Sequence, residues 1–295
     1  MIISASPSDV PAGPKVVAIG SFDGVHLGHR HLLARARRLA QENGLPLLVY
    51  TFDPPTKVFV RGVGMLSTLT EKLELLEEEG VDVTLAVPFD EDFAARDKEE
   101  FLDDLRRIGA ARIVVGADFG FGRGRGGGPA DLELVAPTLV VPLLELAGEP
   151  VKSTRIRELL DRGDVEAARH LLGRPYSARG LVIRGDGIGA ELGFPTANVE
   201  PAPNKVLPRG VFACEATGPK GRFPAVVNVG VRPTVGGNEL RFEAHLLGFS
   251  GDLYGHELKV TFLKKLRDEK QFSSREELRR QIGRDLEEAR RFFRL

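Results

Sequence analysis

The first half of the chain alternates between short, almost continuously apolar runs and longer stretches in which apolar residues recur every three or four positions. Uninterrupted apolar runs are typical of strands buried on both faces, and the three-to-four spacing is typical of amphipathic helices. The apolar runs lie at 16–20, 45–52, 81–89, 111–119 and 138–146, and the helical patterns at 29–43, 70–79 and 98–108. This alternation predicts an α/β domain built on a doubly wound parallel sheet with crossover helices.

The pattern changes in the second half of the chain. A helical pair at 153–173 ends at a glycine shortly before Pro175, where a helix is expected to stop. Short β-like runs then follow one another, separated by Gly, Pro and Asn, at 180–185, 210–217, 223–230, 240–249 and 256–266. They predict a small antiparallel β-barrel, followed by a terminal amphipathic helix near 274–293. We therefore expect two domains, 1–176 and 177–295.

Composition narrows the classes of partner. The chain has 41 basic and 42 acidic residues, which gives a formal net charge of −1 and no overall field to attract nucleic acid or an anionic membrane. Cys214 is the only cysteine, so an intrachain disulfide is impossible and a reducing compartment is expected. The N-terminus lacks the pattern of a signal peptide, and no apolar run approaches the roughly 18–20 residues of a membrane helix. A cytoplasmic protein without nucleic-acid or membrane partners is the expectation.

The first candidate site is the stretch "GSFDGVHLGH", residues 20–29, between an apolar run and a helical pattern. It places His26 and His29 at the start of a helix, where backbone N–H groups favour an anion, and glycines such as Gly20 and Gly28 permit close approach of a phosphate. No Walker loop occurs, and no third ligand lies near enough in sequence to complete a zinc site. Taken alone, the two histidines could equally be ordinary core or capping residues.

Two further stretches bear on the first half. In "KSTRIRELL", residues 152–160, Ser153 and Thr154 can cap a helix, and Arg157 adds a charged fork suited to phosphate; a plain capped surface helix is the alternative. The run "VGADFGFGRGRGGG", residues 115–128, alternates Arg and Gly as segments that bind single-stranded nucleic acid do. Because this run is short and has no basic surroundings, a loop near a bound ligand is the preferred interpretation.

A second candidate site opens the predicted barrel. "GDGIGAELGFPTANV", residues 185–199, is rich in glycine and could wrap phosphates with its backbone. Thr196 and Asn198 lie two apart and share a face if the segment is extended. A hydroxyl and an amide carbonyl are hard oxygen ligands, appropriate to Mg²⁺ that carries nucleotide phosphates. Glu243, in another strand-like run, is a candidate general base for such a site, although alone it could be a solvated strand residue.

Together these motifs resemble one family. "GSFDGVHLGHRHLL" and "KSTRIRELL" are similar to the two signatures of the HxGH nucleotidyltransferases, and the 115–128 run matches one found in prokaryotic FAD synthetases. "GFPTAN", "VVNVGVRPTV" and "RFEAHLLGF" are similar to riboflavin kinase and follow its order. Over about residues 15–294 the chain resembles the bacterial bifunctional riboflavin kinase/FMN adenylyltransferases. The resemblance implies that riboflavin and ATP give FMN, and that FMN and ATP give FAD and pyrophosphate, with Mg²⁺ as the cofactor.

The resemblance also implies roles for single residues. His26 and His29 would stabilise charge on the α-phosphate of ATP, and Glu243 would accept the proton of the ribityl 5′-hydroxyl. Nucleotide and phosphate binding is implied for Gly20, Phe22, Asp23, Gly28, Ser153, Thr154, Arg157, Gly185, Gly193 and Pro195. Flavin binding is implied for Asp53, Asp118, Phe119 and Arg267, and metal binding for Thr196 and Asn198.

Three positions depart from the family pattern. Lys152 stands where a serine is usual, Pro55 where a histidine is usual, and Ala190 where an arginine is usual, a role that Arg184 could take over. These departures leave room for an enzyme that retains only one of the two activities. A flavin- or nucleotide-binding regulator without turnover is the other alternative.

Overall fold

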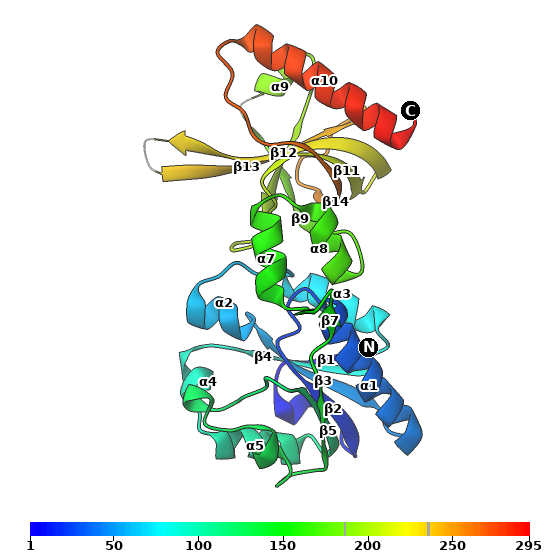
Figure 1. Cartoon of the computed structure of the whole chain (residues 1–295), viewed down its shortest axis with the longest axis vertical. Coiled ribbons are helices and arrows are strands. Elements are labelled where there is room, and N and C mark those ends of the chain that lie inside the picture. The colour runs from blue at the N-terminus through cyan, green and yellow to red at the C-terminus, as the bar shows by residue number, and fades with distance from the viewer. Residues whose placement is uncertain (186, 235–236) are drawn as a thin grey trace. The chain divides into compact units, whose positions relative to one another are not determined.

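The computed structural model describes residues 1–185, 187–234 and 237–295, without the side chains of 188 and 231–239. By contacts between its residues the chain divides into two compact units, Met1–Ser153 and Thr154–Leu295. Each unit has its own sheet, as the labels in Figure 1 show.

The first unit is built on a six-stranded sheet in the order β1-β4-β3-β2-β5-β6, and every neighbouring pair of strands is parallel. Its strands are β1 (Ile2–Ser4), β2 (Lys15–Ile19), β3 (Leu47–Asp53), β4 (Val83–Pro88), β5 (Ala110–Gly116) and β6 (Thr138–Val141). The order of strands reverses between β2 and β5. In open parallel sheets, ligands bind outside the carboxyl ends of the strands at such a switch point.

Helices cover both faces of this sheet, so the doubly wound α/β prediction is confirmed. They are α1 (Leu27–Asn43), α2 (Thr56–Arg61), α3 (Leu69–Glu78), α4 (Glu91–Ala95), α5 (Lys98–Arg107) and α6 (Pro129–Leu132), and a two-stranded hairpin, β7 (Glu145–Leu146) and β8 (Glu149–Pro150), follows. Val17 of β2 packs in one core with Leu105 of α5, while Val16 packs in the other with Leu33 of α1. Alternate side chains of one strand thus enter opposite cores, which explains why polar residues are missing from the run.

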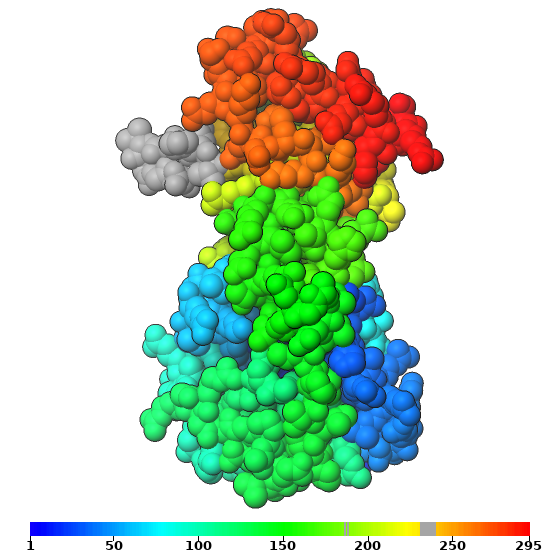
Figure 2. All heavy atoms as spheres, in the orientation of Figure 1, coloured from blue at the N-terminus to red at the C-terminus, as the bar shows by residue number. Residues whose placement is uncertain are grey.

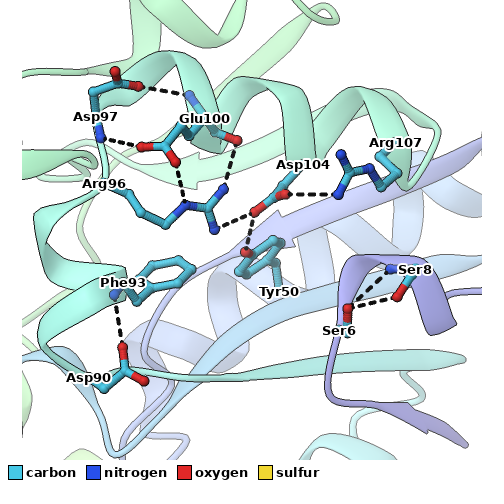
Figure 3. A network of polar contacts seen from close by, with 10 residues as sticks. All are labelled: Ser6, Ser8, Tyr50, Asp90, Phe93, Arg96, Asp97, Glu100, Asp104 and Arg107. Carbon is cyan, nitrogen blue, oxygen red and sulfur yellow. Dashed lines mark hydrogen bonds and ion pairs between the residues drawn. The ribbon is translucent and has the colours of Figure 1, made fainter.

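A buried polar network fastens α5 to the sheet (Figure 3). Asp104 of α5 accepts a hydrogen bond from the Tyr50 hydroxyl at 3.4 Å and forms an ion pair with Arg96 at 2.8 Å. The guanidinium of Arg96 lies 5.0 Å from the centre of the Phe93 ring. Burial raises the pKa of Tyr50, and the Asp104 charge acts in the same direction, so this hydroxyl remains a donor at neutral pH.

The second unit contains a closed six-stranded antiparallel barrel in the order β10-β13-β12-β11-β14-β9, which confirms the barrel prediction. Its strands are β9 (Ser177–Ile183), β10 (Ala197–Pro201), β11 (Gly210–Gly218), β12 (Gly221–Thr234), β13 (Gly237–Leu246) and β14 (Glu257–Arg267). Its helices are α7 (Ser153–Asp161), α8 (Val165–Leu172), α9 (Ile188–Glu191) and α10 (Arg275–Phe293). Leu286 and Ala289 of α10 pack with Val211 and Val226 on the outside of the barrel, which this helix crosses in Figure 2 (red).

The helical pair α7–α8 groups with the barrel, whereas the sequence placed it in the first domain, ending at residue 176. Its contacts are the reason: α8 packs on β14, and Lys265 of β14 donates its backbone N–H to Glu166 and its ammonium to the Arg162 carbonyl. Gly173 ends α8 in the left-handed conformation, as predicted. The Gly–Pro break marks the end of a helix, but the grouping into units depends on packing.

Candidate active sites

The two-histidine loop, residues 20–29, leaves the carboxyl end of β2 beside the switch point and leads into α1. His26 is the N-cap of α1, and its Nδ1 accepts the backbone N–H of His29 at 3.3 Å. This nitrogen is therefore unprotonated, which leaves Nε2 to carry the proton of the neutral ring. The two imidazoles stack with centroids 3.6 Å apart, and the Phe22 ring meets His29 edge-on at 5.3 Å. The loop thus sets two nitrogen donors beside the N–H groups at a helix N-terminus, which together favour a phosphate.

The backbone of this loop is strained in a way that only close packing sustains. Phe22 and Val25 have φ of 46° and 35°, and Gly24 between them has φ of 79°. Non-glycine residues in this region cost of order 1–3 kcal/mol each and concentrate at functional sites. At Gly28 a Cβ would lie 3.0 Å from the Val151 carbonyl oxygen and 3.1 Å from the His26 ring. A larger residue between the histidines would therefore require the His26 ring or the Val151 carbonyl to shift.

Side chains from distant segments hold the loop in place. The buried Asp23 carboxylate accepts the backbone N–H groups of Leu66 at 2.9 Å and Ser67 at 3.1 Å. The hydroxyl of Ser67 accepts the N–H of Gly24 at 2.9 Å, and that of Ser153 donates to the Asp23 carbonyl at 3.1 Å. Asp23, predicted to bind the nucleotide, thus engages the loop's own support through its carboxylate. Ser153, the first residue of α7, lies directly against the loop.

The remaining residues of the second signature are placed as follows. Lys152 forms an ion pair with Asp118 at 3.7 Å. Thr154 and Arg157 lie on the first two turns of α7. Their roles toward the triphosphate stay predictions.

Of the predicted flavin residues in the first unit, Asp53 ends β3, and Asp118 and Phe119 follow β5. Phe119 is partly buried and stacks on Phe121 at 5.8 Å. Pro55 occupies the N-cap position of α2 and makes no side-chain cap. It offers no hydrogen-bond donor where the family pattern has an imidazole.

An aromatic cluster near Asp53 was missed by the sequence analysis. Phe52 lies 5.6 Å from Phe89 and 5.7 Å from Phe93, and Phe59 of α2 meets Phe89 at 5.5 Å. Phe59 is 39% exposed, so one edge of this cluster faces solvent. A planar aromatic ligand could stack there. The repeated "F" at the ends of two predicted strands was the available signal, but only the sheet brings them together.

In the second unit, the glycine-rich loop packs tightly on the predicted metal ligands. A Cβ at Gly185 would lie 2.2 Å from the Asn198 amide, and one at Gly189 would lie 3.0 Å from the Thr196 hydroxyl. The Pro195 carbonyl accepts a hydrogen bond at 2.8 Å from Nδ1 of His245 on β13. The loop is therefore drawn onto the barrel, with the Thr196 and Asn198 side chains against its backbone. Gly193 has φ of 88°, a conformation that favours glycine.

Glu243 stands opposite both neighbouring strands on the outer face of the barrel. Its register partners are Asn198 on β10 and Asn228 on β12, whereas the residues beside it, Phe242 and Ala244, are buried. Directly opposite residues have Cβ atoms about 4.5–5.5 Å apart, so the carboxylate lies between two carboxamides. Arg241 is 3.6 Å from its Oε1. The geometry thus brings Glu243 beside the predicted metal ligand Asn198.

Two predicted positions in this unit have other visible partners. The Arg267 guanidinium donates to both carboxylate oxygens of the buried Asp285 on α10, at 2.9–3.0 Å, and to the Asp268 carbonyl. These hydrogen bonds attach the terminal helix to β14. A contact between Arg267 and flavin stays a prediction. Arg184, the candidate substitute at the exposed Ala190, lies 5.8 Å over the Tyr254 ring.

Among the residues that the structure describes, no group of three or more His, Cys, Asp or Glu side chains could hold a metal ion. No helix among these residues is long and apolar enough to span a membrane.

Paired imidazoles at a helix N-terminus on a parallel sheet, and a glycine-rich loop beside a carboxylate on a barrel, define a two-part nucleotide-dependent transferase. Two families of proteins match the chain: FAD synthetase over residues 10–155 and riboflavin kinase over residues 172–293. The chain belongs to the bifunctional riboflavin kinase/FMN adenylyltransferases. It phosphorylates riboflavin to FMN and adenylylates FMN to FAD with ATP.

Relatives cover nearly the whole chain. The Escherichia coli K12 bifunctional riboflavin kinase/FMN adenylyltransferase is 39% identical over 97% of this chain and 95% of its own length. The Bacillus subtilis protein of the same name is 36% identical over 94% and 92%. A crystal structure from Streptococcus pneumoniae, described as a macrolide-efflux protein, superposes with a TM-score of 0.88 and 30% identity over 98% of both chains.

Proposed function

We propose that FMN adenylylation takes place at the two-histidine loop. The observation that carries this assignment is the stacked pair His26 and His29 at the N-terminus of α1, beside the switch point of the sheet. An oxygen of the FMN phosphate attacks the α-phosphorus of ATP, and the bond to the pyrophosphate leaving group breaks. The attacking phosphate is already ionised, so no general base is needed. The imidazole N–H groups and the helix N-terminus stabilise the charge that develops on the α-phosphate oxygens.

We propose that the flavin end of FMN stacks on the aromatic cluster of Phe52, Phe59, Phe89 and Phe93, with Asp53, Asp118 and Phe119 around it. The cluster lies at and just beyond the carboxyl ends of β3 and β4, on the same edge of the sheet as the histidines. An aromatic surface suits the isoalloxazine ring because it buries a large planar area. Pro55 adds no polar contact there. Ser153, Thr154 and Arg157 are proposed to bind the triphosphate.

We infer that riboflavin is phosphorylated on the outer face of the barrel, with Glu243 as the general base. Glu243 takes the proton of the ribityl 5′-hydroxyl as that oxygen attacks the γ-phosphorus of ATP, and ADP leaves. The glycine-rich loop, including Gly185, Gly193 and Pro195, is proposed to bind the phosphates of ATP through its backbone. The ladder position of Glu243 beside Asn198 supports this arrangement.

Thr196 and Asn198 fit a magnesium ion carried by ATP. Their hard oxygen atoms pack against Gly185 and Gly189, which leaves a site formed by loop backbone and two neutral side chains. When bound, Mg²⁺ neutralises charge on the transferring phosphates. Thr196 and Asn198 orient the nucleotide, and Glu243 accepts the proton of the ribityl hydroxyl.

Because all the substrates are small and the chain has a net charge of −1, we propose that the protein acts in the cytoplasm without nucleic-acid or membrane partners.

Reciprocal variants of the full chain test the two assignments. His29→Asn is expected to lower the rate of FAD formation from supplied FMN by about 10²–10³-fold, as the loss of a transition-state donor does, and to leave FMN formation within about twofold. Glu243→Gln is expected to abolish FMN formation and to leave adenylylation of supplied FMN unchanged. Chromatographic separation of riboflavin, FMN and FAD over time measures both.

The reciprocal pattern is what decides the assignment. If either variant lost both activities while its thermal unfolding matched the parent, the assignment of one reaction to each site would be wrong. If the unmodified chain made FMN but no FAD, only the riboflavin kinase activity would have been retained. Pro55→His and Lys152→Ser would then be the first substitutions to test for recovery of FAD formation.

A further inference from the structure

Helix α3 carries a buried lysine that neither reaction step uses. The side chain of Lys72 is fully buried, and its ammonium donates to the Phe52 carbonyl at 2.6 Å and to the Thr51 hydroxyl at 3.4 Å. Both acceptors belong to the last residues of β3. The charge thus lies at the edge of the sheet where the two-histidine loop leaves β2.

One side chain connects this ammonium to the loop. The Thr51 hydroxyl, which accepts from Lys72, donates in turn to the carbonyl of Ser21 at 3.1 Å. The hydroxyl of Ser21 shares a hydrogen bond of 2.9 Å with that of Thr56, the first residue of α2. Lys72 is therefore tied to the start of the histidine loop and, through it, to the helix that follows Asp53.

The residues just before Lys72 hold the same loop from another side. The N–H groups of Leu66 and Ser67 bind the Asp23 carboxylate, and the Ser67 hydroxyl binds Gly24. Thr68 then caps α3 through a capping box with Glu71. Residues 66–72 thus form one continuous segment, called the brace below, that supports the loop through these hydrogen bonds and has Lys72 at its end.

The cation in this brace is costly, which makes a purely space-filling role a poor explanation. Burial lowers the pKa of Lys72 to about 8, against the opposing effect of the Asp53 and Asp23 carboxylates. A methionine has a similar length and would fill the space without a desolvated charge. At neutral pH most Lys72 side chains are protonated. The ammonium then balances two carboxylates, Asp23 in the loop after β2 and Asp53 at the end of β3.

We propose that Lys72 is a positioning residue for FMN adenylylation. Its ammonium holds the carboxyl ends of β2 and β3 in the arrangement that directs the histidine pair and Asp53 toward ATP and FMN. The inference rests on the proposed adenylylation site. Deprotonation removes the charge that balances Asp23 and Asp53 and weakens the hydrogen bonds to Phe52 and Thr51, which are no longer charge-assisted. The two loop segments are then held less firmly, although no group that contacts substrate is lost.

The test compares the parent, Lys72→Met and Lys72→Arg as full-length proteins, with FMN and ATP supplied, between pH 7 and 10. The kcat of FAD formation by the parent is expected to fall as the pH rises through about 8. In Lys72→Met, kcat is expected to be lower at pH 7 by up to about 100-fold, as a misplacement near 1 Å causes, and to show no such fall. Lys72→Arg keeps a cation that stays charged to pH 10, so the activity it retains is expected to be constant over this range.

Lys15→Met is the matched control. Lys15 is also a buried lysine, with a pKa lowered by burial, and its ammonium donates to the carbonyls of Pro11, Gly13 and Ile108. It lies at the amino end of β2, opposite the end that carries the loop. Its substitution is expected to leave kcat at pH 7 and the alkaline fall within about twofold of the parent.

Two results would overturn the proposal: a parent rate that stays constant from pH 7 to 10, or the same alkaline fall in Lys72→Met as in the parent. The parent profile and Lys72→Arg decide the question even if Lys72→Met does not fold. His29→Asn, assayed in parallel, separates this failure from that of the site. If His29→Asn retains full FAD formation, the site is misassigned; if it loses FAD formation and the Lys72 variants do not, only the positioning role is wrong.

Discussion

At the scale of single residues, the histidine pair depends on the glycine between its members. Gly28 is closely packed: an added Cβ would lie 3.0 Å from the Val151 carbonyl oxygen and 3.1 Å from the His26 ring, so one of these neighbours would have to shift. His26 in turn caps the helix with the nitrogen that faces the His29 N–H. The spacing H-x-G-H therefore follows from one helix cap and one close approach.

Gly28→Ala is expected to lower FAD formation by about 100-fold, since the added methyl displaces the His26 ring, and to leave FMN formation unchanged. The rate of FAD formation from supplied FMN measures the effect. Gly283→Ala is the control, because Gly283 is also within a helix and an added Cβ there would have no atom within 4 Å other than those of its chain neighbours and its own helix backbone. Equal activity in the two variants would show that the ring has room to move.

The titration of Lys72 is also expected to affect stability. As the pH rises, the free energy of unfolding should increase, whereas the rate of FAD formation should fall. Its pKa is lowered on folding from 10.5 to about 8, so between these values the unfolded chain binds more protons than the folded one. The free energy of unfolding of the parent, relative to Lys72→Met, is therefore expected to rise with pH by up to about 1.4 kcal/mol per unit. Urea unfolding at pH 7, 8.5 and 10 measures this difference. A constant difference would mean that Lys72 does not titrate in this range.

At the scale of elements, β14 is joined to α10 by hydrogen bonds from Arg267, a predicted site residue, to a carboxylate of the terminal helix. Arg267 was predicted to bind flavin, yet three of its hydrogen bonds end on Asp285 of α10. The carboxylate is buried at 4% exposure, so removal of its charge leaves the guanidinium without its counter-charge. The terminal helix covers the barrel through this pair and through Leu286 and Ala289.

Asp285→Asn is expected to lower the free energy of unfolding of the barrel unit by about 3 kcal/mol, as the breaking of a buried ion pair does. Glu276→Gln, on the same helix, removes an exposed pair with Arg280 at 3.6 Å and is expected to change stability by less than about 1 kcal/mol. Thermal unfolding followed by circular dichroism compares them. Similar shifts in both would mean that the buried pair adds nothing beyond surface electrostatics.

At the scale of the whole molecule, the chain joins two compact units, and FAD synthetase and riboflavin kinase match different parts of it. The proposed reactions involve no covalent enzyme intermediate, so we expect FMN made by one chain to be usable by another. The boundary at Ser153 falls inside the second nucleotidyltransferase signature, between Lys152 and Arg157. The family matches likewise end at residue 155 and begin again at 172.

A mixture of His29→Asn and Glu243→Gln chains is expected to convert riboflavin and ATP to FAD, although neither variant does so alone. FMN should accumulate first, and FAD should follow after a lag that shortens as the concentration of Glu243→Gln increases. A chromatographic time course measures both products. Failure of the mixture, with both half-reactions intact, would mean that FMN is passed on within one chain.

The sequence by itself determined the fold class of both units and the two principal motifs. Strand burial, helix periodicity and the cap at His26 depend on interactions within a few residues, so they leave local patterns. The same holds for the Gly173 helix end and for the terminal helix that begins at Arg275. The short β1, β10 and α2 were not predicted, because a few residues carry too little periodicity to stand out.

Only the tertiary structure decided which distant residues contact the motifs. Lys72 meets Phe52, Asp23 meets Leu66, and Arg267 meets Asp285 across separations that no local pattern records. The same is true of the aromatic cluster and of the contacts that group α7 and α8 with the barrel. These features depend on which segments lie side by side once strands pair and cores close. The candidate site residues are thus apparent in the sequence, while the contacts that hold them in place emerge only from packing.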